Sequence, residues 1–187
     1  MRDVIRCAVS VTAAVAVLGA CAAPPGEPAA VPPPTSAIGA IPANQPYVTV
    51  QTADGAASVD VPEGWLRTAG GSSLLFTSGF DSVAVDTSAT TRAPSVDSVT
   101  AEVVPVLRTT NDRFVLGSVT AAGTGAGPAI RVTYQAQATS APSPVLLGVE
   151  RYEFWRAGHQ VTLTLSSPLG ADNEAAWRRI VESLRWR

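Results

Sequence analysis

The chain has 187 residues, of which 46% are hydrophobic, with 13 basic and 15 acidic side chains and a formal net charge of −2. This length fits one domain with additional segments, and the near balance of charge excludes a polybasic contact with nucleic acid or membrane. Lysine is absent, and cysteine occurs only at positions 7 and 21.

The N-terminal segment is typical of a secretory signal. Two arginines within the first six residues precede an apolar stretch, CAVSVTAAVAVLGA, that starts at Cys7. This stretch is shorter than the about 20 apolar residues that a membrane-spanning helix needs. The four residues 18–21, LGAC, resemble the bacterial lipobox, in which a diacylglyceryl group is attached to the cysteine and cleavage occurs just before it. The alternative is ordinary secretion, which would leave Cys21 with a free thiol.

We therefore predict a lipoprotein signal peptide over residues 1–20, and we predict that Cys21 is the lipidated first residue of the mature chain. Two acyl chains hold a protein stably on a membrane, at about 0.8 kcal/mol per buried methylene. The predicted location is the extracytoplasmic face of the cell membrane. Cleavage removes Arg2, Asp3 and Arg6, which leaves 11 basic and 14 acidic residues and a net charge of −3. Cys21 would then be the sole thiol, which excludes a structural disulfide and a cysteine-based metal site.

The segment after Cys21 is rich in alanine and proline. Residues 22–46 contain no aromatic side chain, so they cannot bury a core. Pro32–Pro34 favours an extended polyproline II conformation, about 3.1 Å per residue. We predict a disordered tether over residues 21–46, followed by a single domain over residues 47–187.

Alternating apolar and polar residues predict four strands in the first part of the domain. They are Tyr47–Gln51, Ala57–Val61, Ser73–Thr77 and Ser82–Thr87. The turn residues Asp54-Gly55 and Gly79 join them into two hairpins. Apolar residues three and four apart then predict a helix from Ser95 to Leu107, which Pro105 should kink or end.

Four further strands and a second helix complete the domain. The strands are predicted at Arg113–Thr120, Pro128–Ala138, Val145–Arg156 and His159–Ser166, with a loop from Ala121 to Gly127. Asp172 is predicted to cap the last helix, in which Trp177 and Ile180 belong to an apolar stripe. This order predicts the α+β class, with an antiparallel β-sheet flanked by helices.

Several stretches resemble the PsbP-like fold and, within it, the LpqN/LpqT type of actinobacterial lipoprotein. They are VPEGW at 61–65, the mid-chain helix, GPAIRVTYQ from Gly127, and YEFWRAGHQVTLTLSSP from Tyr152. The resemblance covers about Tyr47–Arg187 and implies an α/β/α sandwich. Members of this type resemble adaptors or binding modules, and none of the matching stretches is a catalytic signature.

His159 is the sole histidine, so a serine hydrolase of the triad type would have to use it. The candidate nucleophiles are Ser72, Ser73 and Ser166. His159 follows the predicted turn at residues 157–158, where an exposed histidine is usual, and the sequence has no G-x-S-x-G motif. A solvated turn residue is therefore the favoured interpretation.

Two other patterns are weak candidates for chemistry. Glu150 and Glu153 have opposite strand parity, so they should face opposite sides of the sheet and cannot act as a catalytic pair. The run GTGAGP from Gly123 lacks the spacing of a nucleotide-binding loop and is followed by a strand rather than a helix. We predict a flexible connection there.

The strand from Val145 to Arg156 carries a cluster of aromatic and basic residues. Tyr152 and Phe154 share one face, and Arg151 and Trp155 share the other. A face that no helix covers would suit a glycan, a lipid headgroup or a protein. The favoured alternative is that both faces are packed.

These patterns predict no enzymatic activity, no cofactor and no metal site. We predict a lipid-anchored binding or adaptor protein of the bacterial cell envelope, with a protein or envelope component as partner and without nucleic acid. One alternative is a carrier of a lipid or other hydrophobic ligand, with an apolar pocket between the sheet and a helix. The other alternative is a hydrolase that uses a serine and His159.

Overall fold

The computed structural model describes residues 39–138 and 144–187. These residues belong to one compact unit, Thr35–Arg187. The predicted signal peptide, Cys21 and residues 21–38 of the predicted tether lie outside the described residues. Within the described ranges, no helix combines the length and the apolar character that crossing a membrane requires.

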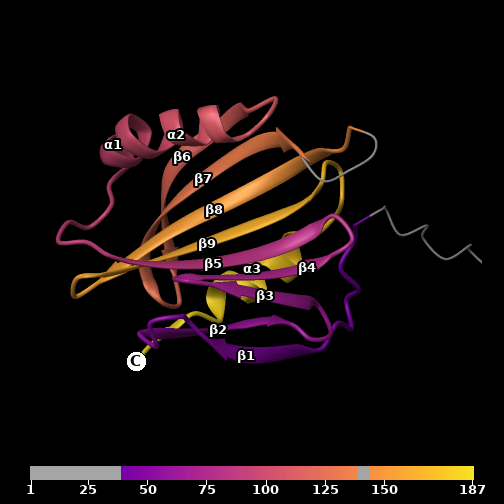
Figure 1. Cartoon of the computed structure of the whole chain (residues 1–187), viewed down its shortest axis with the longest axis horizontal. Coiled ribbons are helices and arrows are strands. Elements are labelled where there is room, and N and C mark those ends of the chain that lie inside the picture. The colour runs from indigo at the N-terminus through magenta and orange to yellow at the C-terminus, as the bar shows by residue number, and fades with distance from the viewer. Residues whose placement is uncertain (1–38, 139–143) are drawn as a thin grey trace, which may run out of the picture. The chain divides into compact units, whose positions relative to one another are not determined.

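Seven strands form an antiparallel sheet in the order β3-β4-β5-β9-β8-β7-β6 (Figure 1). Their bounds are β3 Leu66–Gly70, β4 Ser73–Ser78, β5 Asp81–Ala89, β6 Val115–Thr124, β7 Gly127–Gln137, β8 Leu146–Arg156 and β9 His159–Pro168. The predicted hairpin through Gly79 is confirmed as β4–β5. The predicted loop at Ala121–Gly127 is wrong, because most of it continues β6 into a tight hairpin with β7.

A second sheet of three strands has the order β1-β2-β10. Its strands are β1 Tyr47–Gln51, β2 Ala57–Pro62 and β10 Arg185–Trp186, and the predicted β1–β2 hairpin is confirmed. In β10, Arg185 lies opposite Ser58 and Trp186 opposite Ala57. The structure is therefore mostly antiparallel β-sheet, as predicted. Its strands form two sheets, however, and not the single sheet that we predicted.

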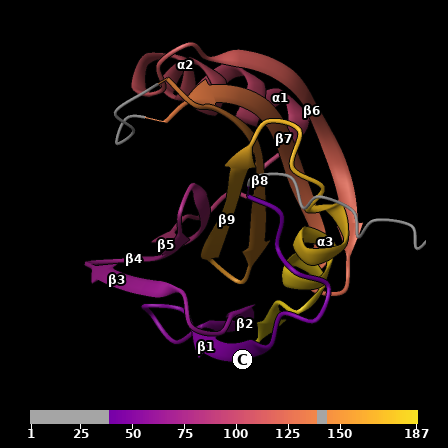
Figure 2. The same cartoon turned by 90° about the vertical axis from the view of Figure 1, so that its right-hand side faces the viewer.

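The larger hydrophobic core lies between the two sheets and helix α3 (Glu174–Glu182), on what we call the inner face of the seven-stranded sheet (Figure 2). Val83 of β5 and Leu163 and Leu165 of β9 have no exposed surface, and neither do Val59 of β2 and Ile180 of α3. Residues of β5 and β9 alternate in direction, so the side chains of Ser82, Thr164 and Ser166 point to the opposite, outer face of the seven-stranded sheet.

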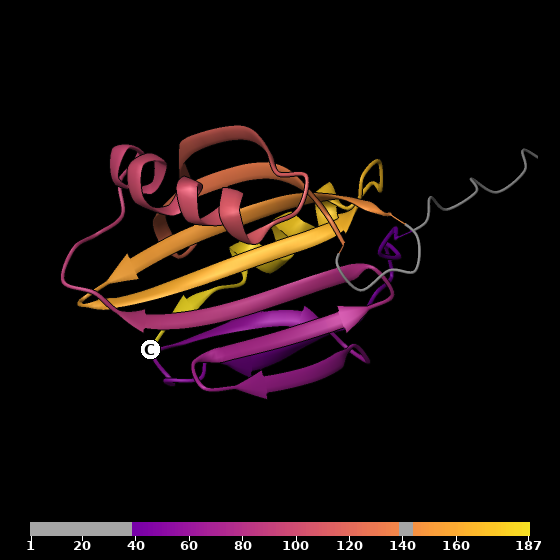
Figure 3. The same ribbon diagram turned by 45° about the horizontal axis from the view of Figure 1, so that its top comes forward.

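A continuous helical segment covers part of the outer face (Figure 3). It comprises α1 (Val96–Ser98), the π-helix η1 (Val99–Val103) and α2 (Val104–Thr110). Ser95, the first residue of the predicted helix, is its N-cap and accepts a hydrogen bond from the Ser98 amide. Pro105 does not end the helix. The wider π-turn directly before it accommodates a residue that has no N–H and whose ring crowds the preceding turn.

The start of α3 differs from the prediction. Asn173, not Asp172, occupies the N-cap position, and its side chain makes no capping bond. Instead, its Oδ1 accepts from the Ile41 amide at 2.7 Å, and its Nδ2 donates to the Gly39 carbonyl at 2.7 Å and to the Asp81 carboxylate at 3.2 Å. Asn173 thereby joins residues 39–41, β5 and α3. The prediction of a disordered tether is wrong for residues 39–41, because Ile41 is buried against the domain.

Candidate functional site

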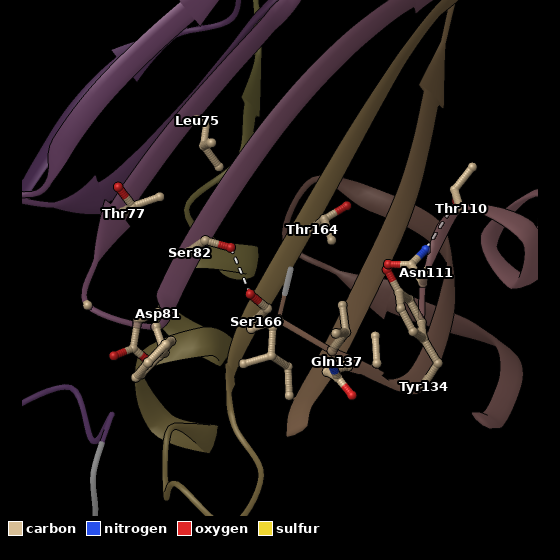
Figure 4. A pocket seen from close by; sticks show the side chains of 16 residues that line it. Leu75, Thr77, Asp81, Ser82, Thr110, Asn111, Tyr134, Gln137, Thr164 and Ser166 are labelled. Carbon is tan, nitrogen blue, oxygen red and sulfur yellow. Dashed lines mark hydrogen bonds between the residues drawn. The ribbon is translucent and has the colours of Figure 1, made fainter. Parts of the chain in front are cut away.

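A cavity of about 400 Å³ lies on the outer face of the seven-stranded sheet (Figure 4). It is bounded by β4, β5, β9, β8 and β7 and by the C-terminal end of α2. Its polar lining includes Thr77, Ser82, Asn111, Tyr134, Gln137, Thr164 and Ser166. Asp81 is the one ionisable acid in the lining, which contains no basic residue.

Strand register brings part of this lining into a single row. Thr77 lies opposite Ser82, which lies opposite Ser166, followed by Val149 and Tyr134 on the next two strands. Directly opposed residues point to the same face of a sheet. The row therefore crosses five strands with hydroxyl groups at both ends and in its centre.

Several polar groups of this cavity are available to a ligand. The exceptions are Ser82 and Ser166, whose Oγ atoms lie 2.7 Å apart and are hydrogen-bonded to each other. Tyr134 is 7% exposed, and its hydroxyl has no hydrogen-bond partner among the described residues, nor do the side chains of Thr164 and Gln137. Burial raises the pKa of Tyr134, so its hydroxyl remains a donor. The cavity can therefore hydrogen-bond an uncharged polar group.

Asp81 lies at the margin of this cavity and is 7% exposed. Burial raises its pKa to about 6, and the hydrogen bond from Asn173 opposes this shift. Its carboxylate is thus charged at pH 7 and becomes neutral in mildly acidic solution.

A second hollow region lies between α3 and the inner face of β7 and β8. Two cavities of about 320 and 290 Å³ share Glu150 and Trp177 in their lining. Arg131 makes a bidentate pair with Glu150, and the Tyr152 hydroxyl donates to Glu150 at 2.7 Å. This region contains a polar network, so it is not the purely apolar pocket on which the carrier prediction depends.

The carboxylates of β8 behave as strand parity predicted. Glu150 belongs to the inner-face network, whereas Glu153 is 2% exposed and pairs with Arg151 at 3.1 Å. The aromatic side chains of this strand are also engaged. Tyr152 stacks on Phe154, with ring centroids 6.2 Å apart, and packs against the inner core.

Trp155 points to the other face of β8, and its indole N–H donates to the Thr90 carbonyl at 2.9 Å. The Arg151 side chain on that face is bonded to Glu153. The aromatic and arginine surface that we considered is therefore used internally, as the packed alternative predicted.

His159 lies next to Asp54, with 3.3 Å between Nδ1 and Oδ2. The hollow around them is also lined by Arg156 and Trp186 but by no serine. Ser166 lies seven residues further along β9, about 23 Å away at the rise of an extended strand. The histidine and this candidate nucleophile are not brought together.

Two further candidate sites have internal explanations. The Gly125 amide in the glycine-rich turn donates to the Glu182 carboxylate at 2.6 Å, so this turn already holds an acidic group of its own chain. Across residues 39–138 and 144–187, no three acidic, histidine or cysteine side chains come together in a way that could hold a metal ion.

No family model matches the sequence, and no curated protein matches it. The fold does resemble solved structures. The solution structure of cyanobacterial PsbP (CyanoP) from Synechocystis sp. PCC 6803 superposes with a TM-score of 0.57 at 12% identity, covering 83% of this chain and 100% of that chain.

Two other solved structures are less similar. The Ran-binding protein Mog1p of Saccharomyces cerevisiae has a TM-score of 0.49 at 12% identity, covering 75% of this chain and 95% of that one. LpqN of Mycobacterium tuberculosis, which is involved in cell envelope biogenesis, has a TM-score of 0.47 at 14% identity, covering 76% and 91%. The likeness to CyanoP establishes that this chain has a PsbP-like fold, and it establishes the fold alone.

Proposed function

We propose that this protein is a lipid-anchored binding protein of the bacterial cell envelope, of the LpqN/LpqT type, without catalytic activity. The observation that carries the anchor is the sequence LGAC at residues 18–21, where Cys21 would receive the lipid. The assignment to this type depends on the stretches quoted from the sequence, such as VPEGW at 61–65.

We assign the binding role to the outer-face cavity. Its lining offers uncharged donors and acceptors, including the hydroxyl of Tyr134, which has no hydrogen-bond partner among the described residues. The lining contains no basic residue that would select an anion. A cavity of about 400 Å³ is within the size range of small-ligand sites. More than half of its lining residues are polar, which favours a ligand that forms hydrogen bonds over a purely apolar one. The favoured occupant is an uncharged, hydrogen-bonding part of an envelope component or of a partner protein.

Site-specific photo-crosslinking of the full-length protein in living bacteria tests this role. A photoreactive phenylalanine analogue replaces Gln137 in the cavity in one variant and Ala175, an exposed residue of α3, in the control variant. The proposal expects an adduct of defined mass from position 137 and none from position 175. Equal labelling at both positions, or labelling at neither, would contradict the assignment.

A further inference from the structure

Strand β6 is an edge of the seven-stranded sheet, because β7 is its one partner strand in the described chain. Figure 2 shows β6 at the margin of the sheet. Its ten residues, VLGSVTAAGT, include no charged residue and no proline. Natural proteins ordinarily guard an edge against pairing with another chain by charge, proline, a bulge or short length. The bulge near Gly117 interrupts β6, and it leaves the run from Ser118 to Thr124 regular.

The opposite edge of the same sheet is guarded differently. Strand β3 has only five residues, and its second residue, Arg67, is charged. A short strand with a charged side chain is a poor template for pairing. The two edges of one sheet thus differ in length and in charge, and the difference singles out β6 as the edge that can accept another strand.

The register shows which backbone groups of β6 point outward. In an antiparallel pair, alternate residues direct both N–H and C=O towards the neighbouring strand. Gly123 lies opposite Pro128, which has no amide hydrogen to donate. Gly123 therefore belongs to the set that points away from β7, and Ala121 and Val119 share its parity. Their backbone groups make no hydrogen bond to any other described segment.

We propose that β6 is a self-association surface, on which two copies of this chain pair β6 with β6 in antiparallel orientation. Ala121 is the middle one of the three outward-directed residues. A twofold axis at Ala121 therefore lets the backbone groups of all three form hydrogen bonds to the second copy. Val119 of one copy then lies opposite Gly123 of the other.

The composition of β6 favours a second copy as the occupant. A twofold axis places identical residues near one another, so a charge in this strand would meet a like charge. The uncharged strand avoids this repulsion. The small side chains of Ala121 and Gly123 allow the two backbones to approach to hydrogen-bonding distance. The pairing joins two seven-stranded sheets and leaves the outer-face cavity of each copy outside the shared edge.

Thiol crosslinking of the full-length protein in isolated membranes tests the register. Ala121→Cys places two thiols directly opposite each other, at a Cα separation of about 5.5 Å, which a disulfide can bridge. Ala101→Cys is the matched control, because Ala101 is an exposed alanine that belongs to η1 and not to the pairing strand. On mild oxidation, Ala121→Cys should give at least about tenfold more covalent dimer than Ala101→Cys. Equal yields would overturn the proposal.

Charge exchange at the same position gives an independent test. Two differently tagged full-length copies are co-expressed, and their co-purification is measured. Copies that both carry Ala121→Lys, or both Ala121→Glu, should lose co-purification because like charges meet at the axis, whereas one copy of each should restore it. Retention of co-purification in both like-charged pairs would overturn the proposal, as would failure of the mixed pair. The co-purification outcomes do not depend on ligand binding in the cavity.

Discussion

The side chain of Asn173 accepts a hydrogen bond of 2.7 Å from the amide of Ile41, a residue 132 positions earlier in the chain. Both residues are buried, with exposed fractions of 3% and 9%. The bond fixes the N-terminal segment to the start of α3 and therefore positions the chain where it enters the domain.

Asn173→Ala should lower the free energy of unfolding by about 1–3 kcal/mol, because it leaves the buried Ile41 amide without a partner. Urea unfolding followed by circular dichroism measures the change. Asp172→Ala is the control, since Asp172 is exposed and is not the N-cap, and it should change stability by less than about 0.5 kcal/mol. The opposite order of the two effects would mean that Asp172 caps α3 after all.

Asp81 should make stability depend on pH. Its pKa of about 6 in the folded chain lies above its ordinary 3.8, so the folded state binds a proton more readily than the unfolded state. The stability contributed by neutral Asp81 is fully present below about pH 4 and is lost as pH rises through about 6.

Asp81→Asn should remove this pH dependence and raise the free energy of unfolding at pH 7 by roughly 1–3 kcal/mol. Unfolding in urea at pH 4.5 and at pH 7 measures both effects. Asp172→Asn, at an exposed position, should leave the wild-type pH dependence intact. An Asp81→Asn variant with the same pH dependence as the wild type would contradict the buried, uncharged state of Asp81 in acid.

Tyr134→Phe should separate binding from stability. The hydroxyl has no partner among the described residues, so its removal should change the free energy of unfolding by less than about 0.5 kcal/mol. A ligand that accepts from this hydroxyl should bind about 5- to 10-fold more weakly, measured as the loss of photo-crosslinking from position 137. Tyr47→Phe, on the separate strand β1, is the control and should leave crosslinking unchanged.

Glu150 should be a stability residue rather than a catalytic one. Glu150→Ala removes the partner of Arg131 and of the Tyr152 hydroxyl, and it should cost about 1–3 kcal/mol in thermal or urea unfolding. Glu174→Ala breaks an exposed i,i+4 pair with Arg178 and should cost less than about 0.5 kcal/mol. Similar costs for both variants would show that the inner-face network contributes no more than a surface ion pair.

The sequence pattern predicts the elements whose alternation or helical spacing is local. The hairpin around Asp54-Gly55, the helix after Ser95 and the strand beginning at His159 all occur as predicted. The strand β3 was missed because neither of its faces is buried, and its residues, LRTAG, therefore do not alternate between apolar and polar types. The extension of β6 was missed because alanine, glycine and threonine at 121–124 are typical of a loop when considered without their partner strand.

The second sheet and the cavity depend on contacts between residues far apart in the chain. The pairing of β10 with β2 joins Trp186 to Ala57, and no local pattern specifies it. The row from Thr77 to Tyr134 likewise requires the order of five strands to be known. Hydroxyl residues on a strand predict an outward face but not which other strands lie beside it, so the sequence could not identify this site.

Lipid anchoring through Cys21 is tested most directly by Cys21→Ala in the full-length protein, expressed in its bacterial host and labelled with a radioactive fatty acid. The wild type and the Cys7→Ala control should carry the label and sediment with membranes, because two acyl chains are enough for stable anchoring. Cys21→Ala should lose the label and leave the membrane fraction. If Cys21→Ala kept the label and stayed with the membranes, Cys21 would not be the lipid anchor.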